Sequence, residues 1–182
     1  MAASAEQKAQ FENELIPVVS KICEERGYDQ AAVPAIVAQA CAETGWGTST
    51  LAQEAHNYFG IKYGDHFNGA KFQGSSATWR AYSSLEEGVN GYFDLLEQPY
   101  YDNSRQYLYG DLKAASSDPS KYISQIAGYG YGGPSEQYKS LVEGVMKENN
   151  LIEKASNYKS TSSNTTTTTT TATNTAVTQQ TQ

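Results

Sequence analysis

Ala35-Ile-Val-Ala-Gln-Ala-Cys-Ala-Glu43-Thr-Gly-Trp-Gly-Thr48 is the stretch from which the fold and chemistry of this chain can be inferred. It predicts an almost wholly apolar helix that ends in one acid, Glu43. At about 100° per residue, Glu43 falls on the same side of the helix as Ile36, on its apolar stripe. A lone carboxyl group there is costly to ionise, so the position favours a general acid that stays protonated near neutral pH. The alternative is a glutamate that turns to water or pairs with a cation.

Composition divides the chain into one domain and a tail. The 182 residues carry a net charge of -7, yet the segment from Thr161 to Gln182 contains no charged and no aromatic residue. An unbroken threonine run fills positions 165–171. Such a segment buries too little apolar surface to offset its ordering entropy. We therefore expect a globular domain over residues 1–157 and a threonine-rich disordered linker or tail over residues 158–182.

Charge and motif content exclude several classes of function. An acidic domain without a basic stripe argues against a nucleic-acid partner. No apolar run is long enough for a membrane span, and the first residues contain no hydrophobic segment of a signal peptide. The isolated histidines His56 and His66 have no metal-ligand spacing, so neither a metal nor another cofactor is expected. Cys23 and Cys41 either pair across neighbouring helices or remain buried free thiols.

Hydrophobic periodicity predicts a mainly helical α+β domain. A first helix begins at a Ser4–Gln7 capping box and is expected to kink or split at Pro17. Glycine-punctuated segments between Tyr63 and Tyr82 predict a small β-hairpin lobe. The other helices are expected near 29–44, 49–54, 83–97, 103–115, 118–127 and 135–149. An α-lobe beside a small β-lobe leaves a cleft, with Glu43 at its edge.

An acid at a cleft with aromatic walls suits the cleavage of a glycosidic bond, because the acid can protonate the leaving oxygen. Sugar rings pack on aromatic faces, so aromatic residues near Glu43 are candidates for the groove, with ordinary core packing as the alternative. These candidates are Trp46, Tyr58, Phe59, Trp79 and Tyr82. Tyr129 lies between glycines in a later loop, from which its phenol could support charge that develops in the transition state.

The motifs occur in a specific order. Glu43-Thr-Gly-Trp-Gly is followed by Asn57-Tyr-Phe-Gly-Ile-Lys62, then by Trp79-Arg-Ala-Tyr, and last by Ala-Gly-Tyr129. From about Val33 to Leu151 the chain resembles glycoside hydrolase family 73. This is the N-acetylglucosaminidase family of bacterial autolysins, flagellar rod-associated hydrolases and phage lysins. The resemblance implies a lysozyme-like fold. It also implies an endo-β-N-acetylglucosaminidase that cleaves the β-1,4 bond between N-acetylglucosamine and N-acetylmuramic acid in peptidoglycan.

The resemblance also implies roles for individual residues. Glu43 matches the general acid and Tyr129 the supporting tyrosine of the family. Trp46, Asn57 and Phe59 match groove and scaffold positions. The segment 62–79 is shorter than the hairpin of many members and contains one acid, Asp65, which is therefore the candidate base. The alternative is that the 2-acetamido group of the substrate acts as the internal nucleophile.

The resemblance places the substrate, peptidoglycan glycan strands, in the cell wall or outside the cell. Threonine-rich tails usually tether a catalytic domain, so a wall-binding module beyond the tail is expected. Two other functions stay open at this point: a catalytically inactive peptidoglycan-binding module, and a muramidase of the same fold.

Overall fold

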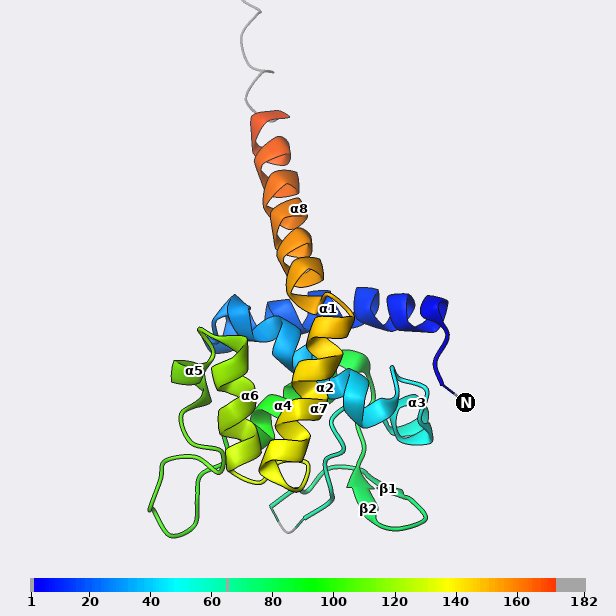
Figure 1. The fold of residues 1–182 in the computed structure, drawn as a ribbon, viewed down its shortest axis with the longest axis vertical. Helices are drawn as coiled ribbons and strands as arrows, with labels where there is room; N and C mark the ends of the chain where they lie inside the picture. Colours follow the sequence, from blue (N-terminus) through cyan, green and yellow to red (C-terminus); the bar gives the residue numbers. More distant parts are fainter. Residues whose placement is uncertain (1, 65, 173–182) are drawn as a thin grey trace, which may run out of the picture.

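The computed structural model describes residues 2–64 and 66–172, with side chains described as far as residue 162. It is mainly helical, with one small hairpin at the end of the molecule opposite α8 (Figure 1). The elements in chain order are α1 (Ala5–Arg26), η1 (Gln30–Ala32), α2 (Val33–Thr44), α3 (Thr50–Ala55), β1 (Lys71–Gln73), β2 (Thr78–Arg80), α4 (Leu85–Leu96), α5 (Leu112–Ala115), α6 (Pro119–Gly128), α7 (Ser135–Glu148) and α8 (Leu151–Ala172). The predicted α+β, mainly helical class is confirmed.

Helix α2 lies at the centre of the described fold, where it packs against α1, α6, α7 and α8 (Figure 1). Every residue from Val33 to Cys41 is buried, so this part of the helix has no side that faces water. A helix that is apolar all round is typical of such a central position. The sequence predicted one apolar stripe along this helix, whereas the helix is buried on all sides. Glu43 lies at the end of this buried helix.

The first helix differs from its prediction. Pro17 was expected to kink or split it, but α1 continues as one helix through Pro17, from its capping box at Ser4 and Gln7 to a left-handed Gly27. A proline removes one hydrogen bond to the carbonyl four residues earlier. That carbonyl belongs to Asn13, an exposed residue, so water can replace the lost donor without breaking the helix.

The region before α6 contains less helix than predicted. A helix was expected over 103–115, whereas only Leu112–Ala115 is helical, with Asp111 as its N-cap. Upstream, the chain forms turns and a bridge between Pro99 and Tyr107. Asn103 and Gly110 both have positive φ, which interrupts helical geometry on either side of Tyr107.

The β-lobe is the short antiparallel pair of β1 and β2, in which Phe72 is opposite Trp79. Lys62 forms a further isolated bridge with Trp79 and joins the preceding loop to the hairpin. The hairpin predicted between Tyr63 and Tyr82 is therefore present, although each strand has only three residues.

Helix α8 includes the first residues of the segment that was expected to be a linker from residue 158. It extends from Leu151 to Ala172 and stands away from the body of the fold (Figure 1). The hydroxyls of Ser160, Thr161 and Ser162 donate to carbonyls four residues earlier. These bonds satisfy the polar side chains within the helix. The division of the chain at residue 157 stays a prediction, and residues 173–182 lie outside the described part.

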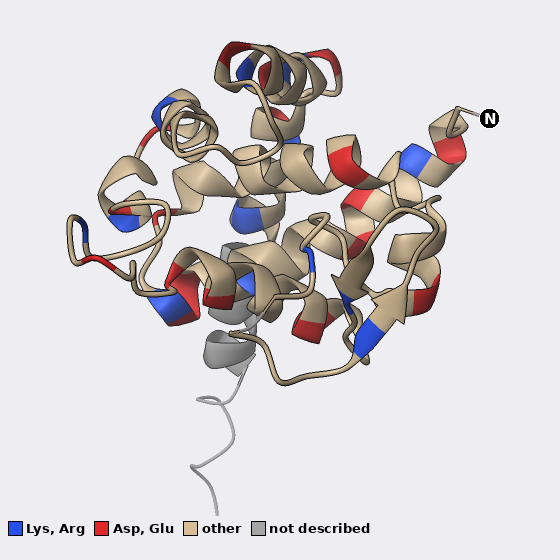
Figure 2. Ribbon diagram, turned by 90° about the horizontal axis from the view of Figure 1, so that it is seen from below, with Lys and Arg blue, Asp and Glu red and all other residues tan. Residues whose placement is uncertain are grey.

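Acidic and basic residues are interspersed over the ribbon in Figure 2. No helix within the described residues has the length and apolar character that crossing a bilayer requires. Cys23 and Cys41 are both free and buried, so the free-thiol alternative holds. Burial raises the pKa of the Cys23 thiol to about 12 and also raises that of Cys41.

Candidate active site

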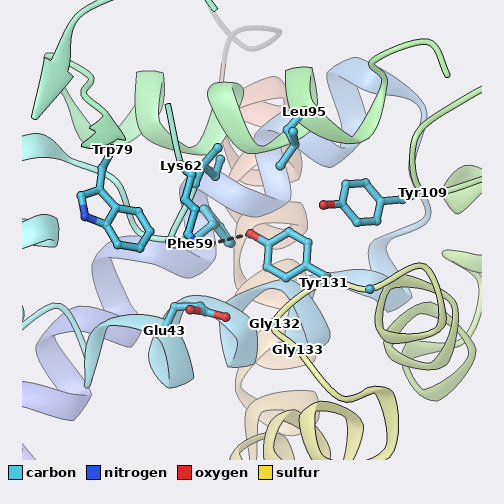
Figure 3. A pocket seen from close by; sticks show the side chains of 12 residues that line it. Glu43, Phe59, Lys62, Trp79, Leu95, Tyr109, Tyr131, Gly132 and Gly133 are labelled. Atoms are coloured by element: carbon cyan, nitrogen blue, oxygen red, sulfur yellow. Dashed lines mark hydrogen bonds between the residues drawn. The ribbon is translucent and has the colours of Figure 1, made fainter. Parts of the chain in front are cut away.

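Glu43 lies in the last turn of α2, at the edge of a cavity of about 410 Å³ (Figure 3). The turn that follows it is fixed locally. The hydroxyl of Thr44 donates to the Ala40 carbonyl at 2.6 Å and accepts from the Gly47 N–H at 2.8 Å, and Gly45 has a left-handed φ of 57°. The cavity is lined by Glu43, Phe59, Gly60, Ile61, Lys62, Trp79, Leu95, Tyr109, Gly130, Tyr131, Gly132 and Gly133.

The surroundings of Glu43 favour its protonated form. Burial raises the pKa of this carboxyl group above its ordinary value, and a hydrogen bond from Tyr138 partly opposes the increase. The Gln39 amide donates to the Tyr138 hydroxyl at 3.1 Å, so the hydroxyl proton is free to point at Glu43. A half-buried acid with a raised pKa has the properties of a general acid.

Gly60 brings the loop after α3 directly against Glu43. A Cβ at this position would lie 2.8 Å from Oε2 of Glu43, and the backbone φ of 63° is left-handed. Only glycine meets both conditions without strain. The Phe-Gly-Ile part of the sequence motif is thus explained by the approach of the backbone to the acid.

Asn57 holds this loop in place and does not line the cavity in the described structure. It is fully buried. Its amide donates to the carbonyls of Ile61 at 2.8 Å and Arg80 at 2.9 Å, and its oxygen accepts from the Ile61 N–H at 3.0 Å. Asn57 therefore joins the loop to the end of β2. Its position is that of a scaffold residue, one of the two roles that the resemblance implied.

Two predicted groove residues, Phe59 and Trp79, do line the cavity with Glu43 (Figure 3). Phe59 is buried and stacks on Tyr92 with 4.0 Å between ring centroids. Trp79 is only partly buried and comes from β2. The cavity thus has one rigid aromatic wall from the core and one from the β-lobe.

Tyr131, rather than the predicted Tyr129, is the tyrosine of this loop that reaches the cavity (Figure 3). Its hydroxyl donates to the Phe59 carbonyl at 2.5 Å. Tyr129 caps the end of α6, is 41% exposed and has its ring 4.5 Å from the Arg105 guanidinium. The left-handed Gly130 turns the chain between the two residues. The sequence Gly-Tyr-Gly-Tyr-Gly-Gly contains both tyrosines. The position at which α6 ends determines that Tyr131, and not Tyr129, lines the cavity.

Trp46 and Tyr58, also predicted for the groove, lie on a different cavity. The Trp46 indole N–H donates to Glu12 at 3.2 Å, and the Tyr58 hydroxyl bonds to Nδ1 of His56 at 3.0 Å. Tyr58 and Phe59 are consecutive, yet Tyr58 lines this second cavity and Phe59 the cavity at Glu43. Tyr82, another candidate for the groove, is likewise absent from the described lining of the Glu43 cavity.

The predicted base, Asp65, lies outside the described residues. Among the described residues that line the cavity, Glu43 is the one carboxylate and Lys62 the one cation. No group of histidine, cysteine, aspartate and glutamate side chains suited to a metal ion occurs in the described part of the chain. The arrangement can protonate a leaving group and bind a ligand between aromatic walls.

The chain is similar to known peptidoglycan hydrolases. The chain is 29% identical over 164 residues to the peptidoglycan hydrolase FlgJ of Pseudomonas aeruginosa, an alignment that covers 81% of this chain and 38% of that protein. The chain thus spans well under half the length of this relative.

Two solved structures share the fold. The catalytic domain of the autolysin Auto from Listeria monocytogenes is 21% identical with a TM-score of 0.63, covering 84% of this chain and 90% of that one. A mutant peptidoglycan hydrolase from Sphingomonas sp. A1 is 22% identical with a TM-score of 0.56, covering 79% and 96%. The predicted lysozyme-like fold is confirmed by these structures. Residues 21–151 match the family described as glucosaminidase, mannosyl-glycoprotein endo-β-N-acetylglucosaminidase, and because this match covers well over half of the chain, the chain belongs to the glucosaminidase family.

Proposed function

We propose that this domain hydrolyses peptidoglycan at the β-1,4 bond between N-acetylglucosamine and N-acetylmuramic acid. The observation that carries the proposal is the half-buried Glu43, whose pKa is raised by burial, at the edge of a cavity with aromatic walls from Phe59 and Trp79. Family membership and the name of the Pseudomonas aeruginosa relative support the substrate class.

In the proposed reaction, Glu43 donates its proton to the glycosidic oxygen as the bond from that oxygen to the anomeric carbon breaks. Positive charge then develops on the sugar ring. Tyr131 lies in the same cavity, so we assign to it the supporting role first predicted for Tyr129. Its hydrogen bond to the Phe59 carbonyl holds the glycine-rich loop beside the acid.

The group that completes the displacement is either Asp65 or the 2-acetamido group of the substrate. A carboxylate that activates water on the opposite face of the sugar inverts the anomeric configuration, whereas acetamido participation retains it. NMR of the first-formed product therefore distinguishes the two routes. Inversion together with inactivity of Asp65→Asn would identify Asp65 as the base.

The test of the main proposal is digestion of purified peptidoglycan, followed by reduction and mass spectrometry of the new ends. The unmodified protein should release reducing-end N-acetylglucosamine. Glu43→Gln should lower the rate by about 10²–10⁴-fold, the usual contribution of a general acid. Glu54→Gln, at an exposed position on α3, is the matched control and should keep full activity. Reducing-end muramic acid would identify a muramidase, and binding without release an inactive module; either result contradicts the proposal.

The place of action follows from the same substrate. We propose that the domain acts at the cell wall or outside the cell, where glycan strands are accessible. The threonine-rich segment over residues 158–182 would then connect it to a wall-binding module in a longer protein, as the length of the relative permits.

A further inference from the structure

A second cavity, of about 420 Å³, lies between the first turns of α1, the loop after α2, and α3. Its lining includes Gln7, Gln10, Trp46, Gln53, His56 and Tyr58. No described residue lines both this cavity and the one at Glu43. The turn that carries Tyr58 and Phe59 separates them, since Tyr58 belongs to the second cavity and Phe59 to the first.

Trp46 is held in this cavity at a cost to the backbone. Its φ is 57°, a left-handed value that is unfavourable for a residue with a bulky side chain. The indole N–H donates to the buried Glu12, and Nζ of Lys8 lies 3.9 Å from the ring centroid. Strained residues that are fixed by their surroundings tend to occur at functional sites. The conformation of Trp46 thus indicates a role beyond filling the core.

Apart from Glu14, the polar lining of the cavity consists of neutral side chains, and its glutamines keep hydrogen-bonding groups for a ligand. Within α1, Gln7 uses its oxygen to accept from the Ser4 N–H, which leaves its amide nitrogen available. Gln10 uses its nitrogen to donate to Glu14, which leaves its oxygen. Gln53 on α3 is exposed, and His56 uses Nδ1 for its bond to Tyr58. An aromatic surface with convergent amides matches the apolar faces and the hydroxyl and acetamido groups of a sugar.

The charges around the cavity restrict the class of sugar. Glu14 is the one carboxylate among its described lining residues, and no lysine or arginine is among them, so the lining offers an anion no lysine or arginine partner. The nearby Lys8 is placed over the Trp46 ring. We propose that this cavity is a second saccharide site, separate from the catalytic one, that binds neutral N-acetylated sugars and disfavours sugars with a carboxylate.

The two tryptophans of the chain allow a direct test, because Trp46 lies in the second cavity and Trp79 in the first. In the full chain with Glu43→Gln and Trp79→Phe, the remaining indole reports on the second cavity, and the loss of Glu43 prevents hydrolysis. Titration with tri-N-acetylchitotriose should change its fluorescence and saturate. No change up to millimolar sugar would overturn the proposal.

A paired variant locates the bound sugar. Adding Gln10→Ala and Gln53→Ala changes two exposed positions and removes two amides from the rim of the second cavity. Each lost hydrogen bond should weaken binding about fivefold, so together they should raise Kd by tenfold or more. Matching thermal unfolding curves would show that the fold is intact. An unchanged Kd would place the sugar elsewhere and contradict the proposal.

The choice of a neutral ligand is tested with a saccharide that carries the lactyl carboxylate of muramic acid, which should bind more weakly than chitotriose. Equal or tighter binding would overturn this part of the proposal. The fluorescence experiment uses a protein that lacks Glu43, whereas the test of hydrolysis uses intact Glu43. Failure of either proposal is therefore recognisable without reference to the other.

Discussion

Lys154→Met should destabilise the domain, because Lys154 is the cationic partner of a buried carboxylate. Glu12 on α1 is only 2% exposed, and Nζ of Lys154, from the first turn of α8, lies 2.5 Å from its Oε2. The substitution keeps most of the aliphatic stem of the lysine but leaves the Glu12 charge without a cation. The structure thus predicts that α8, which begins where the family match ends, contributes to the stability of the domain.

The size of this effect follows from the surroundings of the pair. Removal of one partner from a fully buried pair costs about 3–5 kcal/mol. Here the Lys154 side chain is 45% exposed, and Trp46 still donates to Glu12, so we expect about 2 kcal/mol after this exposure is taken into account. For a chain of this length, that corresponds to a decrease in Tm of about 4–8 °C.

Thermal unfolding followed by circular dichroism at neutral pH measures this decrease. Lys147→Met is the matched control, since Lys147 is exposed near the end of α7, and its Tm should stay within about 1 °C of the parent value. With Glu12→Gln as background, Lys154→Met should cost much less, because no buried charge remains to be neutralised. An equal loss in both backgrounds would refute the assignment of the effect to the ion pair.

Three further predictions concern the site itself. Tyr131→Phe should cost about 1–3 kcal/mol in chemical denaturation, because it leaves the buried Phe59 carbonyl without its donor, and it should lower the rate of hydrolysis under conditions where the fold persists. Tyr138→Phe removes the hydrogen bond that lowers the pKa of Glu43, so the alkaline limb of the rate profile should move to higher pH; a shift to lower pH would contradict this assignment. Glu43→Gln should raise Tm at neutral pH but not below pH 4. The pKa of Glu43 is higher in the folded than in the unfolded state, so the folded protein loses stability as the pH increases above the ordinary pKa of glutamate, and the substitution removes this loss.

The central helix and its acid could be predicted from the sequence because the signals there are local. Glu43 follows an almost wholly apolar segment that is interrupted by Gln39, and glycines mark the end of the helix. The capping boxes and the turn residues likewise placed most of the helix boundaries within a few residues. Predictions from local sequence were wrong at two places. The helix continues through Pro17 because water can reach the carbonyl that lost its donor. The segment between 103 and 111 is not helical because Asn103 and Gly110 have positive φ.

The composition of the cavity could not be predicted in the same way, because it depends on the direction of side chains within loops. Trp46 is three residues from Glu43 in sequence, yet its left-handed backbone and its bond to Glu12 direct it to another cavity. Tyr129 and Tyr131 are two residues apart, and the end of α6 decides which one enters the site. Sequence proximity and aromatic character gave the candidates, whereas backbone conformation selected among them.

The hydrogen bonds behind Glu43 define how the acid can act. The Tyr92 hydroxyl donates to the Gln39 oxygen at 2.6 Å, so the Gln39 amide group must be oriented with its nitrogen toward Tyr138, to which it donates at 3.1 Å. The Tyr138 hydroxyl is therefore an acceptor on one side and is left to donate to Glu43 on the other. A donor to Glu43 stabilises the ionised carboxylate more than the neutral acid. Burial thus favours the protonated form of Glu43 before the proposed reaction, and the Gln39–Tyr138 pair stabilises the carboxylate that remains once the proton has moved to the leaving oxygen.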